Sequence, residues 1–222
     1  MSLADLQQRY SFPEHRPDKV PFYWCLESGG KQLVKDVIRE RGIKLMVEVG
    51  VFFGGSALQW LETSPDLTVI GVDFWVTNWA PYLRVTGDSY AGGKHLKHEG
   101  ISREALVSQL EGSGSTYECV LSNLWDYMDR FVPMCAASPA ALYEIAGFDV
   151  TPELVYIDSD KHGDDLEACH ELWPDCVICG DDWTWKPAEG YPVRKAVTAF
   201  AEKHGFEIKS MYGTWLLEKK NV

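Results

Sequence analysis

LMVEVGVFFGGS (45–56) and VIGVDF (69–74) are the two stretches that decide the fold. The apolar run at the start of the first stretch is typical of a buried parallel strand, which we expect to end at Glu48. Gly50, Gly54 and Gly55 then predict a permissive turn that opens onto a helix over 56–61. Such a turn lets a ligand approach the backbone and meet the free N–H groups of a helix start.

The second stretch completes a nucleoside-binding α/β unit. Val69–Val72 is a second apolar strand that ends in Asp73, and an acid at this place accepts hydrogen bonds from a ribose. The dinucleotide fingerprint G-x-G-x-x-G fails at Phe52, and the Gly-Lys-Ser/Thr sequence of a P-loop is missing. The alternative is an ordinary strand–helix turn followed by an acidic strand tip.

Glu48, Gly50, Gly54 and Ser56 form E-x-G-x-x-x-G-x-S, which resembles the glycine motif of class I S-adenosylmethionine (SAM)-dependent methyltransferases. In that family the glycine turn passes the methionine part of SAM, and the acid after the second strand binds the ribose hydroxyls. The resemblance therefore implies SAM as the cofactor, with these four residues and Asp73 as its binding residues.

Length and charge narrow the class of protein and its partners. The chain has 222 residues, and its 21 basic and 33 acidic residues give a net charge of −12. This charge disfavours nucleic acid or an anionic membrane as a partner. No signal peptide and no apolar run of membrane-spanning length is present, so we expect a soluble, cytoplasmic protein. Cys176 and Cys179 lie on opposite faces of a predicted strand, which makes them a poor chelate or disulfide.

The order of the elements predicts one α/β domain over 1–222. We expect a Rossmann-like class I methyltransferase fold, a mostly parallel seven-stranded sheet with helices on both faces and an antiparallel C-terminal hairpin. The further predicted strands are Tyr117–Leu121, Glu153–Ile157, Cys176–Cys179, Phe206–Lys209 and Thr214–Leu217, and the predicted helices are Ser28–Gly42, Arg103–Leu110, Leu124–Phe131, Asp164–Leu172 and Val193–His204. An aromatic arm (1–27) and a cap-like insertion (74–116) are added to this plan.

Three carboxylates follow two neighbouring predicted strands. Asp158 comes after the fourth strand, and Asp181 and Asp182 come after the fifth. The carboxyl ends of parallel strands meet at the sheet edge where ligands bind. Oxygen-rich groups of this kind suit Mg²⁺ or another divalent cation. Solvated or helix-capping aspartates are the alternative.

Three further motifs resemble one branch of the methyltransferases. They are YIDSD (156–160), GDDW (180–183) and VRKAV (193–197), and the branch holds the macrocin-type O-methyltransferases and the relatives named cephalosporin hydroxylases. Catechol-type O-methyltransferases use a similar carboxylate site. The resemblance implies Asp158, Asp181 and Asp182 as metal ligands, with Asp160 competing for the first place. In these enzymes the metal holds the acceptor hydroxyl beside the sulfonium methyl group.

The general base is left open by a departure from that branch. The branch reads D-G-D-H, whereas here Lys161 stands in the place of the histidine and His162 follows it. Either side chain could take the hydroxyl proton, since His162 has the better ordinary pKa and Lys161 would need its pKa lowered.

The sequence as a whole predicts a SAM-dependent, metal-dependent O-methyltransferase that acts on a hydroxyl of a small molecule, in a possible homo-oligomer. A metal-independent N- or C-methyltransferase and a non-catalytic cofactor-binding module are the alternatives. The acceptor would lie against aromatic walls, for which Trp75, Trp79, Trp183 and Trp185 are the candidates.

Overall fold

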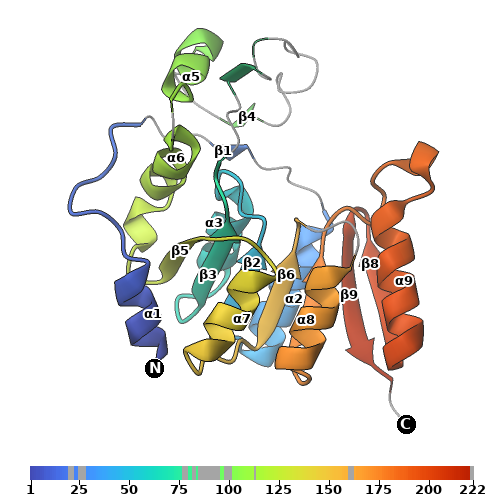
Figure 1. Cartoon of the computed structure of the whole chain (residues 1–222). Coiled ribbons are helices and arrows are strands. Elements are labelled where there is room, and N and C mark those ends of the chain that lie inside the picture. The colour runs from blue at the N-terminus through green and yellow to red at the C-terminus, as the bar shows by residue number, and fades with distance from the viewer. Residues whose placement is uncertain are drawn as a thin grey trace.

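Seven strands form one mixed sheet in the order β5-β3-β2-β6-β7-β9-β8 (Figure 1). The computed structural model describes residues 1–19, 23–24, 29–76, 80–81, 84, 96–97, 102–112, 114–159 and 163–220. The strands are β2 (Leu45–Val49), β3 (Thr68–Asp73), β5 (Phe131–Cys135), β6 (Leu154–Ile157), β7 (Val177–Gly180), β8 (Phe206–Met211) and β9 (Thr214–Lys219). The first five of these are parallel, and β9 pairs antiparallel with both β7 and β8. The predicted fold class, with its C-terminal hairpin, is confirmed.

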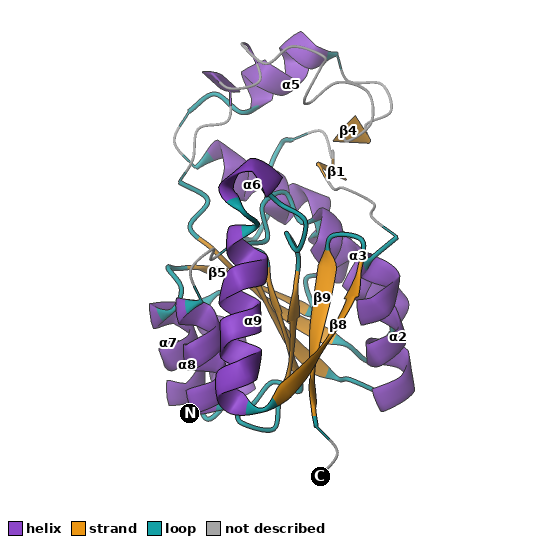
Figure 2. Cartoon of the chain, turned by 90° about the vertical axis from the view of Figure 1, so that its right-hand side faces the viewer, coloured by secondary structure: helices purple, strands orange, loops and turns teal. Residues whose placement is uncertain are grey.

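Helices cover both faces of this sheet (Figure 2). They are α1 (Leu3–Arg9), α2 (Lys31–Arg41), α3 (Gly55–Thr63), α6 (Ser115–Asn123), α7 (Ala140–Gly147), α8 (Asp164–Leu172) and α9 (Pro192–His204). Successive strand residues point to opposite faces, so Val47 packs in one core with α7, α8 and α9, while Met46 packs in the other with α2 and α3. Cys176 and Cys179 fall in these two different cores, as predicted.

The remaining described elements are short. They are α5 (Arg103–Gln109), the 3₁₀ turns η1 (Trp125–Tyr127) and η2 (Pro187–Glu189), and a ribbon in which β1 (Tyr23–Trp24) pairs antiparallel with β4 (Leu96–Lys97). Through this ribbon the N-terminal arm meets the insertion at the carboxyl-edge end of the sheet (Figure 1). The cap function of the insertion stays a prediction. Among the described residues no helix combines the length and apolarity that a membrane crossing needs.

The third strand is where the sequence prediction was wrong. Tyr117–Leu121 lies in helix α6, and the strand that pairs with β3 is Phe131–Cys135, part of which was predicted to end a helix. Tyr117, Val120, Leu121 and Leu124 recur at helical spacing, which makes one apolar helix face. Pro133 argues against a central strand, but β5 is at the sheet edge, where a proline is tolerated.

The strand order creates a switch point at the carboxyl ends of β2 and β6. From β2 the chain builds outward through β3, and it later returns to build the other half from β6. The two tips lie so close that a Cβ on Gly50 would be 2.7 Å from the carbonyl oxygen of Asp158. Ligands of open α/β sheets bind in the crevice at such a point.

Candidate functional site at the carboxyl edge of the sheet

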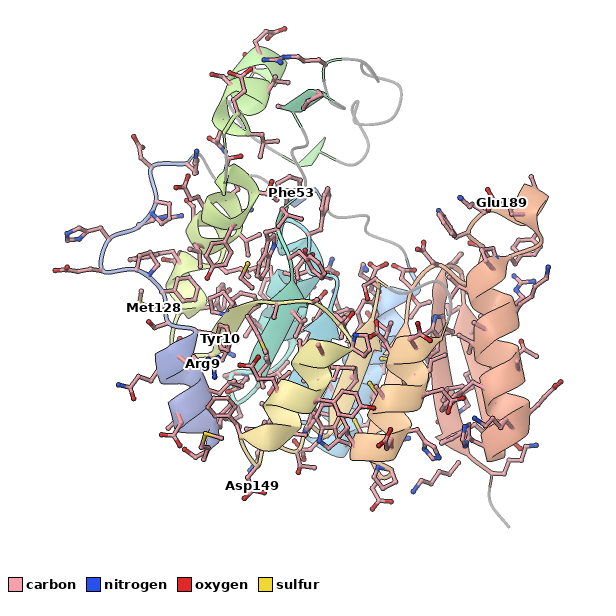
Figure 3. The ribbon with its side chains drawn as sticks, viewed as in Figure 1. Arg9, Tyr10, Phe53, Met128, Asp149 and Glu189 are labelled. Carbon is pink, nitrogen blue, oxygen red and sulfur yellow. The ribbon has the colours of Figure 1, made fainter. Side chains whose placement is uncertain are left out.

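Strained backbone gathers at this edge. Positive φ is uncommon for residues with side chains, and it concentrates at functional sites because the surroundings must hold it in place. Six of the seven described non-glycine residues with positive φ follow the carboxyl ends of β2, β3 and β7 or form the β8–β9 turn: Phe52, Trp75, Asp182, Lys186, Tyr191 and Tyr212. The seventh, Asp149, is at the opposite end of the molecule from Phe53 and Glu189 (Figure 3).

The glycine turn after β2 is clamped by the tip of β3. One carboxylate oxygen of Asp73, Oδ2, accepts a hydrogen bond from the backbone N–H of Phe52 at 2.9 Å, and Oδ1 accepts one from Trp75 at the same distance. The indole Nε1 of Trp75 donates back to the carbonyl of Phe52 at 2.8 Å. A carboxylate has about four lone-pair sites, so Asp73 keeps acceptor capacity for ribose hydroxyls.

The same turn opens directly onto helix α3. Gly54 is the N-cap residue with φ of +80°, so the turn needs the left-handed conformation that glycine tolerates. From helix α6, the amide of Asn123 donates to the carbonyl of Phe53 at 2.9 Å. Sequence reasoning missed Asn123, because it assigned this region to a strand followed by a different helix.

Glu48 lies under the turn and is fully buried. The Ser56 hydroxyl donates to its Oε1. Its Oε2 has no hydrogen-bond partner among the described residues. Burial raises the pKa of Glu48 to about 7, although the Ser56 hydrogen bond and the Lys31 ammonium oppose the rise. Glu48 and Ser56 thus join the strand to helix α3, and their contact with a cofactor stays a prediction.

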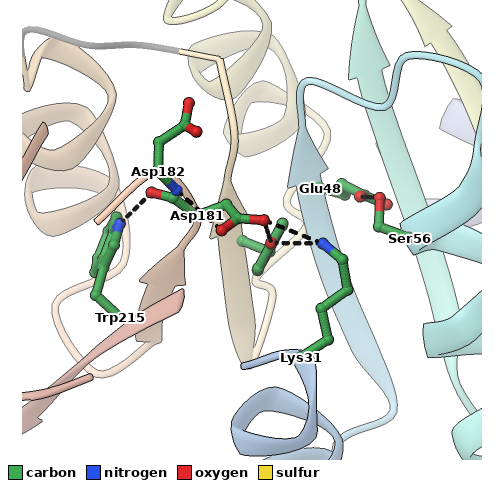
Figure 4. Close-up of polar contacts among 7 residues, drawn as sticks. Lys31, Glu48, Ser56, Asp181, Asp182 and Trp215 are labelled. Atoms are coloured by element: carbon green, nitrogen blue, oxygen red, sulfur yellow. Dashed lines mark hydrogen bonds and ion pairs between the residues drawn. The ribbon is translucent and has the colours of Figure 1, made fainter. Parts of the chain in front are cut away.

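The ammonium group of Lys31 lies at the centre of a hydrogen-bond network at the tips of β6 and β7 (Figure 4). Lys31 begins helix α2, is only 3% exposed, and donates from Nζ to the Tyr156 hydroxyl at 3.1 Å and to Asp181 Oδ2 at 3.2 Å. The Tyr156 hydroxyl donates to the same carboxylate oxygen at 3.1 Å. Burial, with the Asp181 charge as a second cause, raises the pKa of Tyr156 well above its ordinary value. The sequence prediction did not include Lys31.

The three predicted metal ligands have different surroundings. Asp181 is held by Lys31 and Tyr156, and its Oδ1 accepts the backbone N–H of Asp182 at 2.9 Å. The Asp182 carboxylate points away from this network (Figure 4). Asp158 follows β6, the neighbour of β7, and its backbone N–H donates to the carbonyl oxygen of Val49 at 2.8 Å. In the described part of the chain no three acidic, cysteine or histidine side chains form a group able to hold a metal.

The predicted general bases Lys161 and His162, and the competing ligand Asp160, lie outside the described residues. Trp79 also lies outside them. Trp75 is 4% exposed, so its prediction as an acceptor wall was wrong: it is used to clamp the turn.

Trp183 and Trp185 are half-buried next to the β7 tip. The guanidinium carbon of Arg194 is 4.9 Å from the Trp183 ring centroid, and the ammonium of Lys186 is 4.4 Å from that of Trp185. Their role as acceptor walls stays a prediction.

Comparison with known proteins places this edge in a known architecture. No protein-family model matches the sequence, and no curated protein matches it. Among solved structures, the O-methyltransferase TomG from Streptomyces achromogenes, in complex with SAM, has 14% identity and a TM-score of 0.54, with 98% of this chain and 87% of that chain covered. The chain has the class I methyltransferase fold.

Two further methyltransferase structures support the same assignment of the fold. The O-methyltransferase from Bacillus cereus, in complex with S-adenosylhomocysteine (SAH), has 14% identity and a TM-score of 0.52, with 98% of this chain and 90% of that chain covered. SAH-bound PaMTH1 from Podospora anserina has 14% identity and a TM-score of 0.50, with 86% and 78% covered. At 14% identity the similarity to these methyltransferases shows the fold alone. The activity must be argued from the residues of the site.

Proposed function

We propose that this protein transfers the methyl group of SAM to a hydroxyl group of a small molecule. The observation that carries the proposal is the Asp73 clamp: an acidic strand tip that fixes the glycine turn of a methyltransferase fold at the switch point of the sheet. SAM, when bound, supplies an electrophilic methyl group on a positively charged sulfur. Asp73 would hold its ribose, and the turn from Gly50 to Gly54 would pass its methionine part.

The residues at the tips of β6 and β7 would prepare the acceptor. With SAM bound, the acceptor oxygen would form a bond to the methyl carbon as the carbon–sulfur bond breaks, SAH would leave, and the hydroxyl proton would pass to a base. Lys161 and His162 remain the proposed bases. The chain's main contribution would be to hold the acceptor oxygen in line with the methyl group.

The second part of the proposal is a divalent cation. Its proposed protein ligands are two of the three aspartates that the sequence indicated. We leave Asp181 out of the ligand set, because the Lys31 ammonium 3.2 Å from its Oδ2 already compensates its charge and would repel a second cation. Asp158 and Asp182 remain the proposed ligands. They follow neighbouring strands, which supports the proposal, and Mg²⁺ is commonly bound by one or two carboxylates together with water and substrate. Bound there, the cation would lower the pKa of the acceptor hydroxyl.

The test follows SAH release from protein that has been stripped with a chelator and incubated with SAM and a library of hydroxyl compounds, before and after Mg²⁺ is added. We expect release only with Mg²⁺, loss of release in Asp182→Ala, and normal release in the control Asp175→Ala, which changes an exposed acid elsewhere. SAM affinity should be unchanged throughout, because the cofactor turn is on other strands. Full methyl transfer by the stripped protein would contradict the requirement for a metal and favour the metal-independent alternative. In that alternative Lys31 alone compensates the charge of Asp181. SAM binding without any transfer would favour the non-catalytic alternative.

A further inference from the structure

Arg194 has an unusual setting beside the β7 tip. It belongs to the first turn of α9, and its guanidinium carbon is 4.3 Å from the ring centroid of Tyr191 and 4.9 Å from that of Trp183. Its Nε donates to the carbonyl of Trp183 at 3.3 Å. Trp183 directly follows Asp182, so the guanidinium is fixed next to the proposed acceptor site.

Its charge has no partner in the described part of the chain. The protein carries 33 acidic residues against 21 basic ones, yet no described carboxylate forms an ion pair with Arg194. Glu189, the only acid in 183–195, pairs instead with Lys186 at 2.9 Å. The Nη groups of Arg194 likewise donate to no described residue.

The aromatic contacts of Arg194 are held by strained and hydrogen-bonded backbone. Tyr191 has φ of +58°, a conformation that is uncommon for a bulky residue. The backbone N–H of Trp183 donates to Gly213 in the β8–β9 turn at 2.8 Å. A guanidinium fixed between two aromatic residues loses little further freedom when it binds, and its planar donors match the oxygens of a carboxylate or a phosphate.

We propose that Arg194 binds an anionic oxygen group, a carboxylate or a phosphate, on the methyl acceptor. The proposal rests on the proposed function and narrows its substrate class to small molecules that carry both a hydroxyl and such an anion. Trp183 and Tyr191 would contact the apolar part of the acceptor. Arg194 is thus a specificity-determining residue, separate from the cofactor turn.

The test measures binding, so it does not need the acceptor itself. Benzoate, phenyl phosphate and neutral benzamide are titrated into SAH-saturated protein and followed by ligand-observed NMR. The variants are Arg194→Gln, Arg194→Lys and, as a control, Arg39→Gln, which removes an exposed arginine on α2. A charge-assisted hydrogen bond of this kind predicts a loss of roughly 10- to 100-fold in affinity for the anionic probe in Arg194→Gln.

We expect benzoate or phenyl phosphate to bind the parent protein more tightly than benzamide, with a smaller loss in Arg194→Lys and none in Arg39→Gln. The anion that binds more tightly shows whether the acceptor carries a carboxylate or a phosphate. No binding of either anion to the parent, or equal binding by Arg194→Gln, would overturn the inference. Failure of the parent protein to bind SAH would contradict the proposed function instead. The anions would then be titrated into protein without SAH, and the same comparison of variants would test Arg194.

Discussion

Gly50 shows at the scale of one residue why the turn requires glycine. Its φ is +91°, and a Cβ would be 2.7 Å from the carbonyl oxygen of Asp158. The backbone conformation disfavours a side chain and the close approach of the β6 tip leaves no room for one, and neither effect requires a bound ligand. A glycine in a binding motif can therefore be needed for the fold as well as for the cofactor.

Gly50→Ala should lower the free energy of unfolding by roughly 2–5 kcal/mol, because the φ penalty and the clash with a neighbouring strand add. Gly42→Ala is the matched control: it has φ of +62°, but its Cβ would meet no described atom within 4 Å. The control should lose only roughly 1–2 kcal/mol. Urea unfolding of both variants decides the matter, and equal losses would contradict the steric account.

Glu48 gives a prediction for the dependence of stability on pH. Its pKa is about 7 in the folded protein and 4.5 ordinarily, so between these values the folded state binds more protons than the unfolded state. Stability contributed by this group is therefore present below pH 4.5 and is lost as pH rises toward 7, by about 3 kcal/mol in total. Glu48→Gln should remove this slope, as measured by unfolding at pH 5 and pH 7.5. An unchanged slope would show that Glu48 is charged throughout.

At the scale of elements, Lys31 joins helix α2 to strands β6 and β7. The signal for it in the sequence was indirect: a lysine begins the helix that precedes β2, and the start of that helix lies at the carboxyl edge of the sheet. Its partner Asp181 is 150 residues away along the chain. Local periodicity cannot predict such a pair, because the pairing depends on the completed sheet.

Lys31→Met should lower the free energy of unfolding by about 3 kcal/mol, because it leaves Asp181 partly buried without its cation. Asp181→Asn added to this variant should restore roughly 1 kcal/mol or more, since the uncompensated charge is removed. Lys209→Met breaks an exposed pair with Glu218 and should cost at most about 1 kcal/mol. A double variant no more stable than the single one would contradict the coupling.

Two elements that the sequence predicted well have clear stop or turn signals, which are Pro174 after the helix and Gly213 in the hairpin. Helix Asp164–Leu172 and the C-terminal hairpin were predicted within two residues of their observed ends. The third strand was wrong because a short apolar run suits a helix or a strand equally, and Pro133 hid the true strand at the sheet edge. Of the candidate site, the glycine turn and Asp73 were placed together correctly, whereas the partners of Asp181 needed the tertiary structure.

At the scale of the whole molecule, the sheet divides the proposed reaction into two halves. The tips of β2 and β3 form the turn proposed for SAM, and the tips of β6 and β7 carry the residues proposed for the acceptor. The switch point between β2 and β6 brings these halves together, which is why one sheet edge can hold both reactants.

SAM binding by isothermal titration calorimetry tests the central claim most directly. The parent protein should bind SAM, and Asp73→Ala should weaken binding about 10- to 100-fold, because a charge-assisted hydrogen bond to a ribose hydroxyl is lost. Asp66→Ala changes an exposed acid before the other end of β3 and should bind like the parent. No SAM binding by the parent, or equal binding by Asp73→Ala, would contradict the account.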